Sequence, residues 1–91
     1  MPVEEVSLVI TNKEGLHARP ASLLVQTAAE FRSKIMLRFA EKAANAKSIM
    51  GVLKLGVSPG DTIVVQAEGE DAEQAIAALT DLVRRKFDEE K

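Results

Sequence analysis

The only histidine of the sequence, His17, stands in the run GLHARP at residues 15–20, among residue types that suit phosphate chemistry. Much of an imidazole population is unprotonated near neutral pH, so a ring nitrogen is available to attack phosphorus. Arg19, two residues further on, carries a permanent charge and a planar fork of N–H donors that can bind phosphoryl oxygens in pairs. Phosphoryl transfer depends mainly on positioning and charge stabilisation, so a short loop is enough for a protein that only carries the group.

The residues around His17 predict the junction between a strand and a helix. Apolar side chains alternate over residues 6–10, which indicates a half-buried strand, and the polar residues 11–15 with their glycine indicate a loop. Pro20 has no amide hydrogen and is tolerated only in the first turn of a helix, so His17 lies at or beside the helix start. The backbone amides there, Ala18 included, lack an intrahelical partner and favour an arriving negative charge.

Other interpretations of these residues stay open. An isolated histidine at a helix boundary is often an exposed cap with no chemistry, and the residue types alone favour neither interpretation. A metal site would need a second His or Cys at ligand spacing, which the sequence does not offer, so we predict no metal and no cofactor. Nothing near Ser22 or Ser48 indicates the activated nucleophile of a catalytic triad.

Composition limits the class of protein. A chain of 91 residues is expected to form one domain, which we assign to residues 1–87, followed by a charged tail at 88–91. With 46% apolar and 29% charged residues, it is typical of soluble globular proteins. The net charge of −2 and the absence of a long basic run argue against nucleic acid as a partner. No window approaches the ~18 apolar residues of a membrane span, so we expect a cytoplasmic protein without membrane insertion.

The remaining periodic segments complete a fold. They predict an α+β protein with the order β-α-β-β-α-β-α, an open-faced two-layer β-sandwich in which helices cover one face of a four-stranded antiparallel sheet. In the last helix the apolar period runs from Ala72 to Phe87, and Asp71 followed by Gln74 resembles a capping box. The segments between His17 and that helix are a helix that has Pro20 in its first turn and ends near Phe31, strands at 35–39 and 43–45, a short helix at 48–53, a turn at 56–61 and a strand at 63–67.

The run GLHARPA at residues 15–21 resembles the active-site signature of HPr, the histidine-containing phosphocarrier family of the bacterial phosphoenolpyruvate:sugar phosphotransferase system. The segment NAKSIMGVLKLGV at residues 45–57 is similar to that family's regulatory-serine segment, and the resemblance extends over nearly the whole chain. It implies the same sandwich fold and a phosphoryl group carried on Nδ1 of His17. Phosphorylated enzyme I would be the donor and enzyme IIA domains the acceptors, with Arg19 steadying the group and Pro20 shaping the loop.

The resemblance gives further residues a second role. Ser48 is expected to cap the short helix, and the resemblance makes it a phosphorylation target of an HPr kinase/phosphorylase, with catabolite control protein A as a further partner. Leu23, Met50 and Leu53 could each fill the core or form an exposed docking patch. The resemblance favours docking for Leu23 and Met50 and leaves Leu53 open. We expect a monomer, since the docking surface must stay accessible to successive partners.

The resemblance leaves two points open: the geometry of one hairpin and the pathway that the protein serves. Residues 40–42 (AEK) stand where family members often have an Asn-Gly turn, so the geometry of that hairpin is open. The signature at His17 also fits a paralogue in a nitrogen-related or regulatory phosphorelay, and the element order alone fits a small α/β interaction module without chemistry. In the leading interpretation the protein is a stoichiometric intermediate of sugar transport and not a true catalyst.

Overall fold

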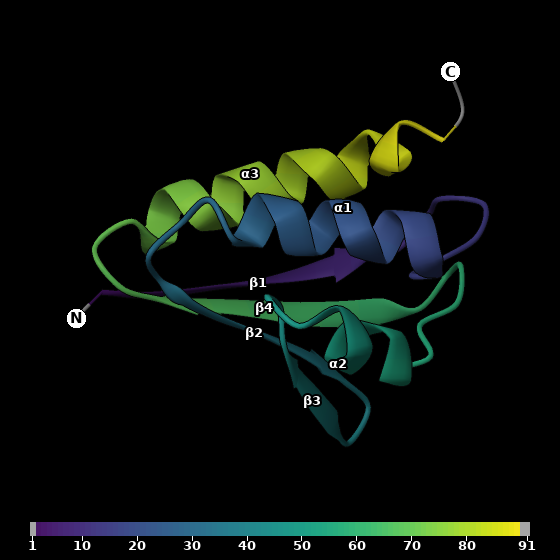
Figure 1. Cartoon of the computed structure of the whole chain (residues 1–91), viewed down its shortest axis with the longest axis horizontal. Coiled ribbons are helices and arrows are strands. Elements are labelled where there is room, and N and C mark those ends of the chain that lie inside the picture. Colours follow the sequence, from purple (N-terminus) through teal and green to yellow (C-terminus); the bar gives the residue numbers. More distant parts are fainter. Residues whose placement is uncertain (1, 90–91) are drawn as a thin grey trace.

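The computed structural model describes residues 2–89, and its elements follow the predicted order. Figure 1 labels the helices and strands. They are β1 (Val3–Val9), α1 (Ala18–Ala28), β2 (Lys34–Phe39), β3 (Lys42–Asn45), α2 (Ile49–Lys54), β4 (Thr62–Glu68), α3 (Ala72–Arg84) and a 3-10 turn, η1 (Lys86–Asp88). No helix in this part of the chain is long and apolar enough to cross a membrane.

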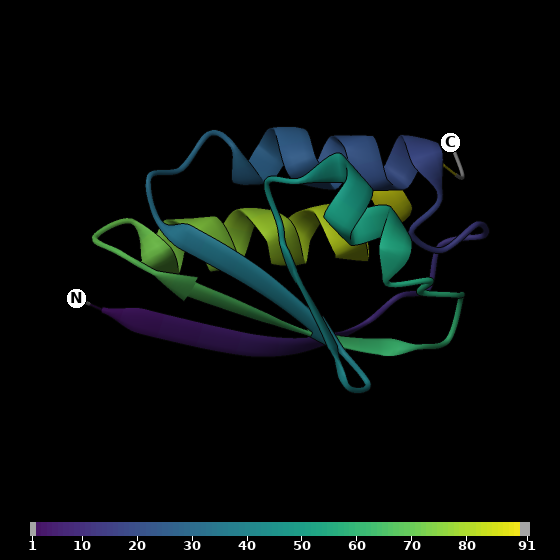
Figure 2. The same ribbon diagram turned by 60° about the horizontal axis from the view of Figure 1, so that its bottom comes forward.

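The four strands form one sheet in the order β1-β4-β2-β3, with every neighbouring pair antiparallel. The helices lie on one side of this sheet, and its other face is left open (Figures 1 and 2). The predicted open-faced sandwich is therefore confirmed. Alternation along β4 illustrates the cause, because Ile63, Val65 and Ala67 are buried while the residues between them are more exposed.

The core lies between the sheet and the long helices. Helix α1 buries Ala21, Leu24 and Ala28, which share one face at helical spacing, as the sequence predicted. Helix α3 contributes Leu79 and four further buried residues: Ala72, Ala75, Leu82 and Val83. These contacts fix the direction of α1 and so the position of its first residue.

The end of α3 differs from the prediction. The helix stops at Arg84, although the apolar period continues to Phe87. Lys86, Phe87 and Asp88 all have positive φ, so the chain makes a left-handed turn that still brings the Phe87 side chain into the core at 0% exposure. The apolar spacing indicates that Phe87 is buried but does not specify the backbone conformation. A tight turn can bury this side chain as well as a helix can. The predicted charged tail at 88–91 falls partly outside the described residues.

The capping box predicted at the start of α3 is also wrong. Asp71 occupies the N-cap position of α3, but its side chain makes no capping hydrogen bond. Its carboxylate instead accepts hydrogen bonds from the backbone amides of Arg32 and Ser33 and from the Ser33 hydroxyl. Those hydrogen bonds, the one from the Ser33 hydroxyl first, hold the pKa of Asp71 below its ordinary value. Asp71 thus ties the α1–β2 connection to the start of α3.

The hairpin between β2 and β3 closes through Ala40 and Glu41, since Phe39 pairs with Lys42. Ala40 adopts a φ of +54°, in the left-handed region that Asn or Gly enters more easily. The strand therefore begins at Lys42, one residue earlier than the sequence indicated.

Candidate functional site

His17 lies immediately before α1, in an extended conformation with φ −81° and ψ −169°. Its carbonyl oxygen accepts the first hydrogen bond of the helix, 2.8 Å from the amide nitrogen of Ala21. The ring is on an exposed residue and makes no capping hydrogen bond. His17 thus occupies the cap position while its side chain is left available for other chemistry.

The first turn of α1 presents unpaired donors next to this ring. Within residues 2–89, the amides of Ala18 and Arg19 donate no hydrogen bond, because the residues that would accept them precede the helix. Pro20 has no amide to leave unsatisfied, and it is buried against the core. The predicted helix start is confirmed, with Pro20 in the first turn.

Hydrogen bonds and close packing hold the loop of residues 12–16, which precedes His17. Gly15 has a φ of +67°, and a Cβ atom built there would lie 2.5 Å from the carbonyl oxygen of Val57, so only glycine fits without strain. The amide of Leu16 donates to that same carbonyl at 3.1 Å. On the other side, the buried side chain of Asn12 donates to the carbonyl oxygen of Gly15 at 2.8 Å.

His17 borders a hollow of about 230 Å³ between the start of α1 and the end of α2. The segment that follows α2 lies at the same end of the molecule as the loop before α1 (Figures 1 and 2). The hollow is large enough for a phosphoryl group or a partner side chain. Its walls are formed by Leu16, His17, Ala18, Leu53, Gly56, Val57 and Ser58.

Arg19 lies away from that hollow. It is exposed and lines a second depression of about 310 Å³ together with Lys13, Glu14 and Glu89. No residue in the described part of the chain forms a hydrogen bond or ion pair with its guanidinium. The structure therefore brings Arg19 onto the first turn of the same helix as His17 but directs it to a neighbouring depression.

Glu89 is a residue of this region that sequence reasoning missed. Its carboxylate oxygen Oε1 accepts hydrogen bonds from Nδ2 of Asn12 at 3.1 Å and from the amide of Glu14 at 3.3 Å. No local pattern could have paired residues 77 positions apart. The last described residue thus contacts the loop that precedes His17.

Ser48 is the cap of α2, as predicted. Its hydroxyl oxygen accepts a hydrogen bond from the amide of Gly51 at 3.1 Å, and the residue is half-buried. Helix α2 lies beside α1 (Figure 2), so Ser48 belongs to the element that packs against the helix carrying His17.

The surface of α2 carries a cluster of exposed apolar side chains. Met50 is 61% exposed, Ile49 39% and Leu53 36%. Leu23 of α1 is only half-buried and packs against the core, so it contributes to both the core and the surface. Ile49 was not singled out from the sequence, because a lone apolar residue in a short helix carries no periodic signal. We call Leu23, Ile49, Met50 and Leu53 the apolar patch.

The titratable side chains between residues 2 and 89 form no group of three or more that could hold a metal ion.

Comparison with known proteins agrees with this geometry. The family model for the phosphorylation site of the HPr component of the phosphotransferase system matches residues 4–85. A crystal structure of HPr-C-His from Thermoanaerobacter tengcongensis is 55% identical, with 97% of this chain and 99% of that chain covered and a TM-score of 0.93. HPr from Bacillus anthracis is 40% identical, over 91% of this chain and 99% of that chain, with a TM-score of 0.87.

A regulatory relative is also similar. The catabolite repression protein Crh of Bacillus subtilis, whose crystal structure is a domain-swapped dimer, is 42% identical. The match covers 87% of this chain and 91% of that chain, with a TM-score of 0.73.

Proposed function

Because this chain belongs to the HPr family of phosphotransferase-system phosphocarriers, we propose that His17 accepts a phosphoryl group from phosphorylated enzyme I and donates it to enzyme IIA domains of sugar transporters. The observation that carries the proposal is the exposed His17 ring at the N-terminus of α1, uninvolved in capping and next to free amides.

The chemistry needs one ring nitrogen of His17, which we assign to Nδ1. The nitrogen attacks phosphorus, an N–P bond forms, and the bond between phosphorus and the donor enzyme's leaving atom breaks. The amides of Ala18 and Arg19 and the helix dipole favour the arriving charge by about 0.3–1 kcal/mol, and by up to ~2 kcal/mol in partly buried geometry. Transfer to the next partner reverses these steps, so moderate stabilisation suits a carrier.

Arg19 completes the site by moving. Its side chain lines the depression next to Glu14 and Glu89, with no ion pair to another described residue. A long, unrestrained side chain on the first turn of α1 can rotate toward a phosphoryl group on His17 and bind its oxygens in pairs. Pro20, buried at the third helical position, keeps the turn beneath it fixed.

The apolar patch provides the docking surface for enzyme I and the enzyme IIA domains. Leu53 belongs to the patch and also lines the hollow beside His17, so a partner seated on α2 reaches the ring directly. The flexible side chain of Met50 suits a surface that must bind different partners in turn. A monomer keeps this patch accessible, and a cytoplasmic location places it where these enzymes act.

Ser48 gives the carrier a regulatory site. Phosphorylation by an HPr kinase/phosphorylase would add a charge of about −1.5 to −2 at the start of α2. Since α2 packs against α1, this charge would repel a phosphoryl donor that approaches His17, and it would create an acidic feature for catabolite control protein A. The similarity to Crh supports a regulatory role of this kind, and the histidine at position 17 supports the carrier role.

One experiment tests the carrier role. The protein is incubated with phosphoenolpyruvate, magnesium and enzyme I, and the product is examined for a phosphate that is labile in acid and stable in base. We expect one such phosphate in the wild type and none in His17→Ala. A wild type that takes up no phosphate would refute the proposal.

A further inference from the structure

The last described residues turn back toward the loop that precedes His17. Lys86, Phe87 and Asp88 have φ values of +54°, +54° and +60°, a conformation that side chains with a Cβ seldom adopt in succession. The turn persists because the Phe87 side chain is fully buried. Such strain is retained only where the surrounding structure over-determines it.

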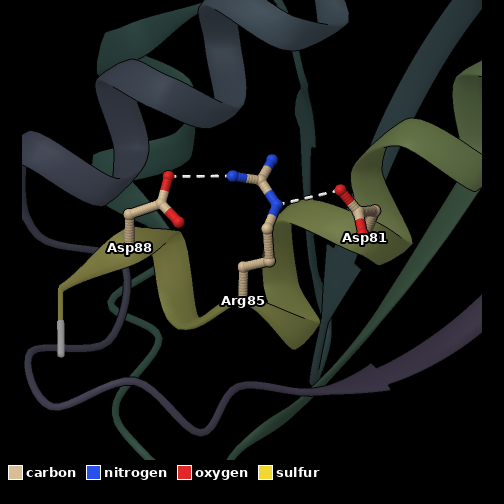
Figure 3. A network of polar contacts seen from close by, with 3 residues as sticks. All are labelled: Asp81, Arg85 and Asp88. Atoms are coloured by element: carbon tan, nitrogen blue, oxygen red, sulfur yellow. Dashed lines mark hydrogen bonds and ion pairs between the residues drawn. The ribbon is translucent and has the colours of Figure 1, made fainter. Parts of the chain in front are cut away.

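Arg85 holds the outside of this turn. Its guanidinium donates to Asp81 of α3 at 2.9 Å and to Asp88 at 2.8 Å, and Figure 3 shows the three side chains in a row with Arg85 between the carboxylates. The buried Phe87 and this bridge fix the turn from two sides. Glu89 is the next residue after this turn, so the fixed turn determines where Glu89 lies.

Glu89 accepts two hydrogen bonds from the loop that precedes His17. Oε1 accepts from Nδ2 of Asn12 at 3.1 Å and from the amide of Glu14 at 3.3 Å. The same Asn12 nitrogen donates to the carbonyl oxygen of Gly15 at 2.8 Å, and the Gly15 amide donates to the Asn12 carbonyl oxygen at 3.4 Å. Glu89 thus orients the Asn12 side chain that holds the Gly15 carbonyl, while the backbone carbonyl of Asn12 accepts from the Gly15 amide.

Gly15 transmits this restraint to the site. It adopts a positive φ, and the next residue, Leu16, is anchored through its amide to Val57. The backbone of His17 therefore follows a loop that is held by Glu89 on one side and, through Val57, by the segment after α2 on the other. If Glu89 is removed, Asn12 keeps a single partner and the Glu14 amide loses its acceptor.

We infer that Glu89 is a positioning residue for phosphoryl transfer: by fixing residues 12–15 it holds the His17 ring in the orientation that attacks phosphorus. This inference rests on the proposed carrier function. Small misplacement of a reacting group lowers a transfer rate strongly even when binding is unaffected. The expected effect is therefore on kcat and not on KM.

The test compares Glu89→Ala and Glu89→Gln with Glu73→Ala, a control that removes an exposed carboxylate from the first turn of α3. Rates of His17 phosphorylation by phosphorylated enzyme I are measured at a temperature where every variant is folded by circular dichroism. Hydrogen exchange of the Glu14 and Gly15 amides is followed by NMR in the same samples. This second readout does not depend on any partner enzyme.

We expect Glu89→Ala to lower kcat by about tenfold with KM unchanged and to speed exchange at both amides. Glu89→Gln, whose amide oxygen can accept the same two hydrogen bonds, should recover most of the rate, and Glu73→Ala should match the wild type. Wild-type phosphorylation together with an unchanged rate in Glu89→Ala would overturn the positioning role alone. A rate in Glu89→Gln as low as in Glu89→Ala would also overturn it, because charge and not hydrogen bonding would then matter. A wild type that is not phosphorylated would instead overturn the carrier function and the inference with it.

Discussion

The amide of Leu16 donates a hydrogen bond to the carbonyl oxygen of Val57 at 3.1 Å, which joins the loop before α1 to the segment after α2. These two segments carry the opposite walls of the hollow beside His17. His17, Ala18 and Leu53, the last a member of the apolar patch, therefore border one hollow, and their relative positions depend on this junction.

Gly15→Ala should disrupt the junction. The new Cβ would meet the Val57 carbonyl at 2.5 Å on a backbone with φ +67°. We expect a loss of about 1–2 kcal/mol from the left-handed conformation and a further ~1–3 kcal/mol from the clash, measured by urea denaturation. Gly56→Ala is the matched control, because its φ is also +67° and nothing lies within 4 Å of the added atom. Equal losses in both variants would show that the close approach to Val57 is unimportant.

Met50→Asp should weaken docking without unfolding the protein. Met50 is 61% exposed, so a charge there costs little folding free energy but opposes burial against a partner. We expect KM for enzyme I to rise about tenfold, which corresponds to ~1.4 kcal/mol, with kcat nearly constant. Val3→Asp replaces a similarly exposed residue at the start of β1, away from the N-terminus of α1 (Figure 1), and should leave KM unchanged. A rise of the same size in both variants would argue against the patch.

Ser48 variants separate capping from charge. Ser48→Ala removes the acceptor of the Gly51 amide and should cost about 1 kcal/mol of stability with little effect on transfer. Ser48→Asp keeps an oxygen acceptor and adds a negative charge, so it should slow phosphorylation of His17 by enzyme I. The initial rate of His17 phosphorylation by enzyme I is measured under equal conditions for the wild type, Ser48→Ala and Ser48→Asp. Equal rates for wild type and Ser48→Asp would remove the electrostatic argument.

Asp71 makes stability depend on acid pH. Its pKa is lowered in the folded protein by hydrogen bonds from the Ser33 hydroxyl and the Arg32 amide, so the unfolded chain binds a proton more readily than the folded one. The resulting stabilisation is complete above the ordinary value of 3.8 and is lost as pH falls through the lower folded value. We expect the wild type to lose stability more steeply below pH 3.8 than Asp71→Asn does, with Glu73→Gln as an exposed control. Parallel curves for wild type and Asp71→Asn would contradict this.

The sequence predicted the parts of the site that depend on local chemistry. Pro20 located the helix start because proline is confined to the first turn, and strand alternation located the sheet face that the helices cover. The cap at Ser48 was also visible, since a hydroxyl before a short helix has an immediate partner.

What the sequence could not predict depends on contacts between distant residues. Phe87 has helical spacing but lies in a left-handed turn, because burial constrains where a side chain ends and not how the backbone brings it there. Asp71 has the position of a capping-box residue, but its carboxylate accepts hydrogen bonds from the amides of Arg32 and Ser33, which follow α1. Glu89 reaches Asn12 only because that turn redirects the chain.

The complete relay provides the most direct measurement. Protein phosphorylated by enzyme I is freed of the donor and mixed with an enzyme IIA domain, and intact mass is followed for both proteins. We predict that one phosphoryl group leaves the wild type and appears on the IIA domain, and that His17→Ala neither receives nor passes one. A phosphoryl group that remains on the wild type, or that reaches the IIA domain equally well through His17→Ala, would contradict a carrier whose chemistry resides on His17.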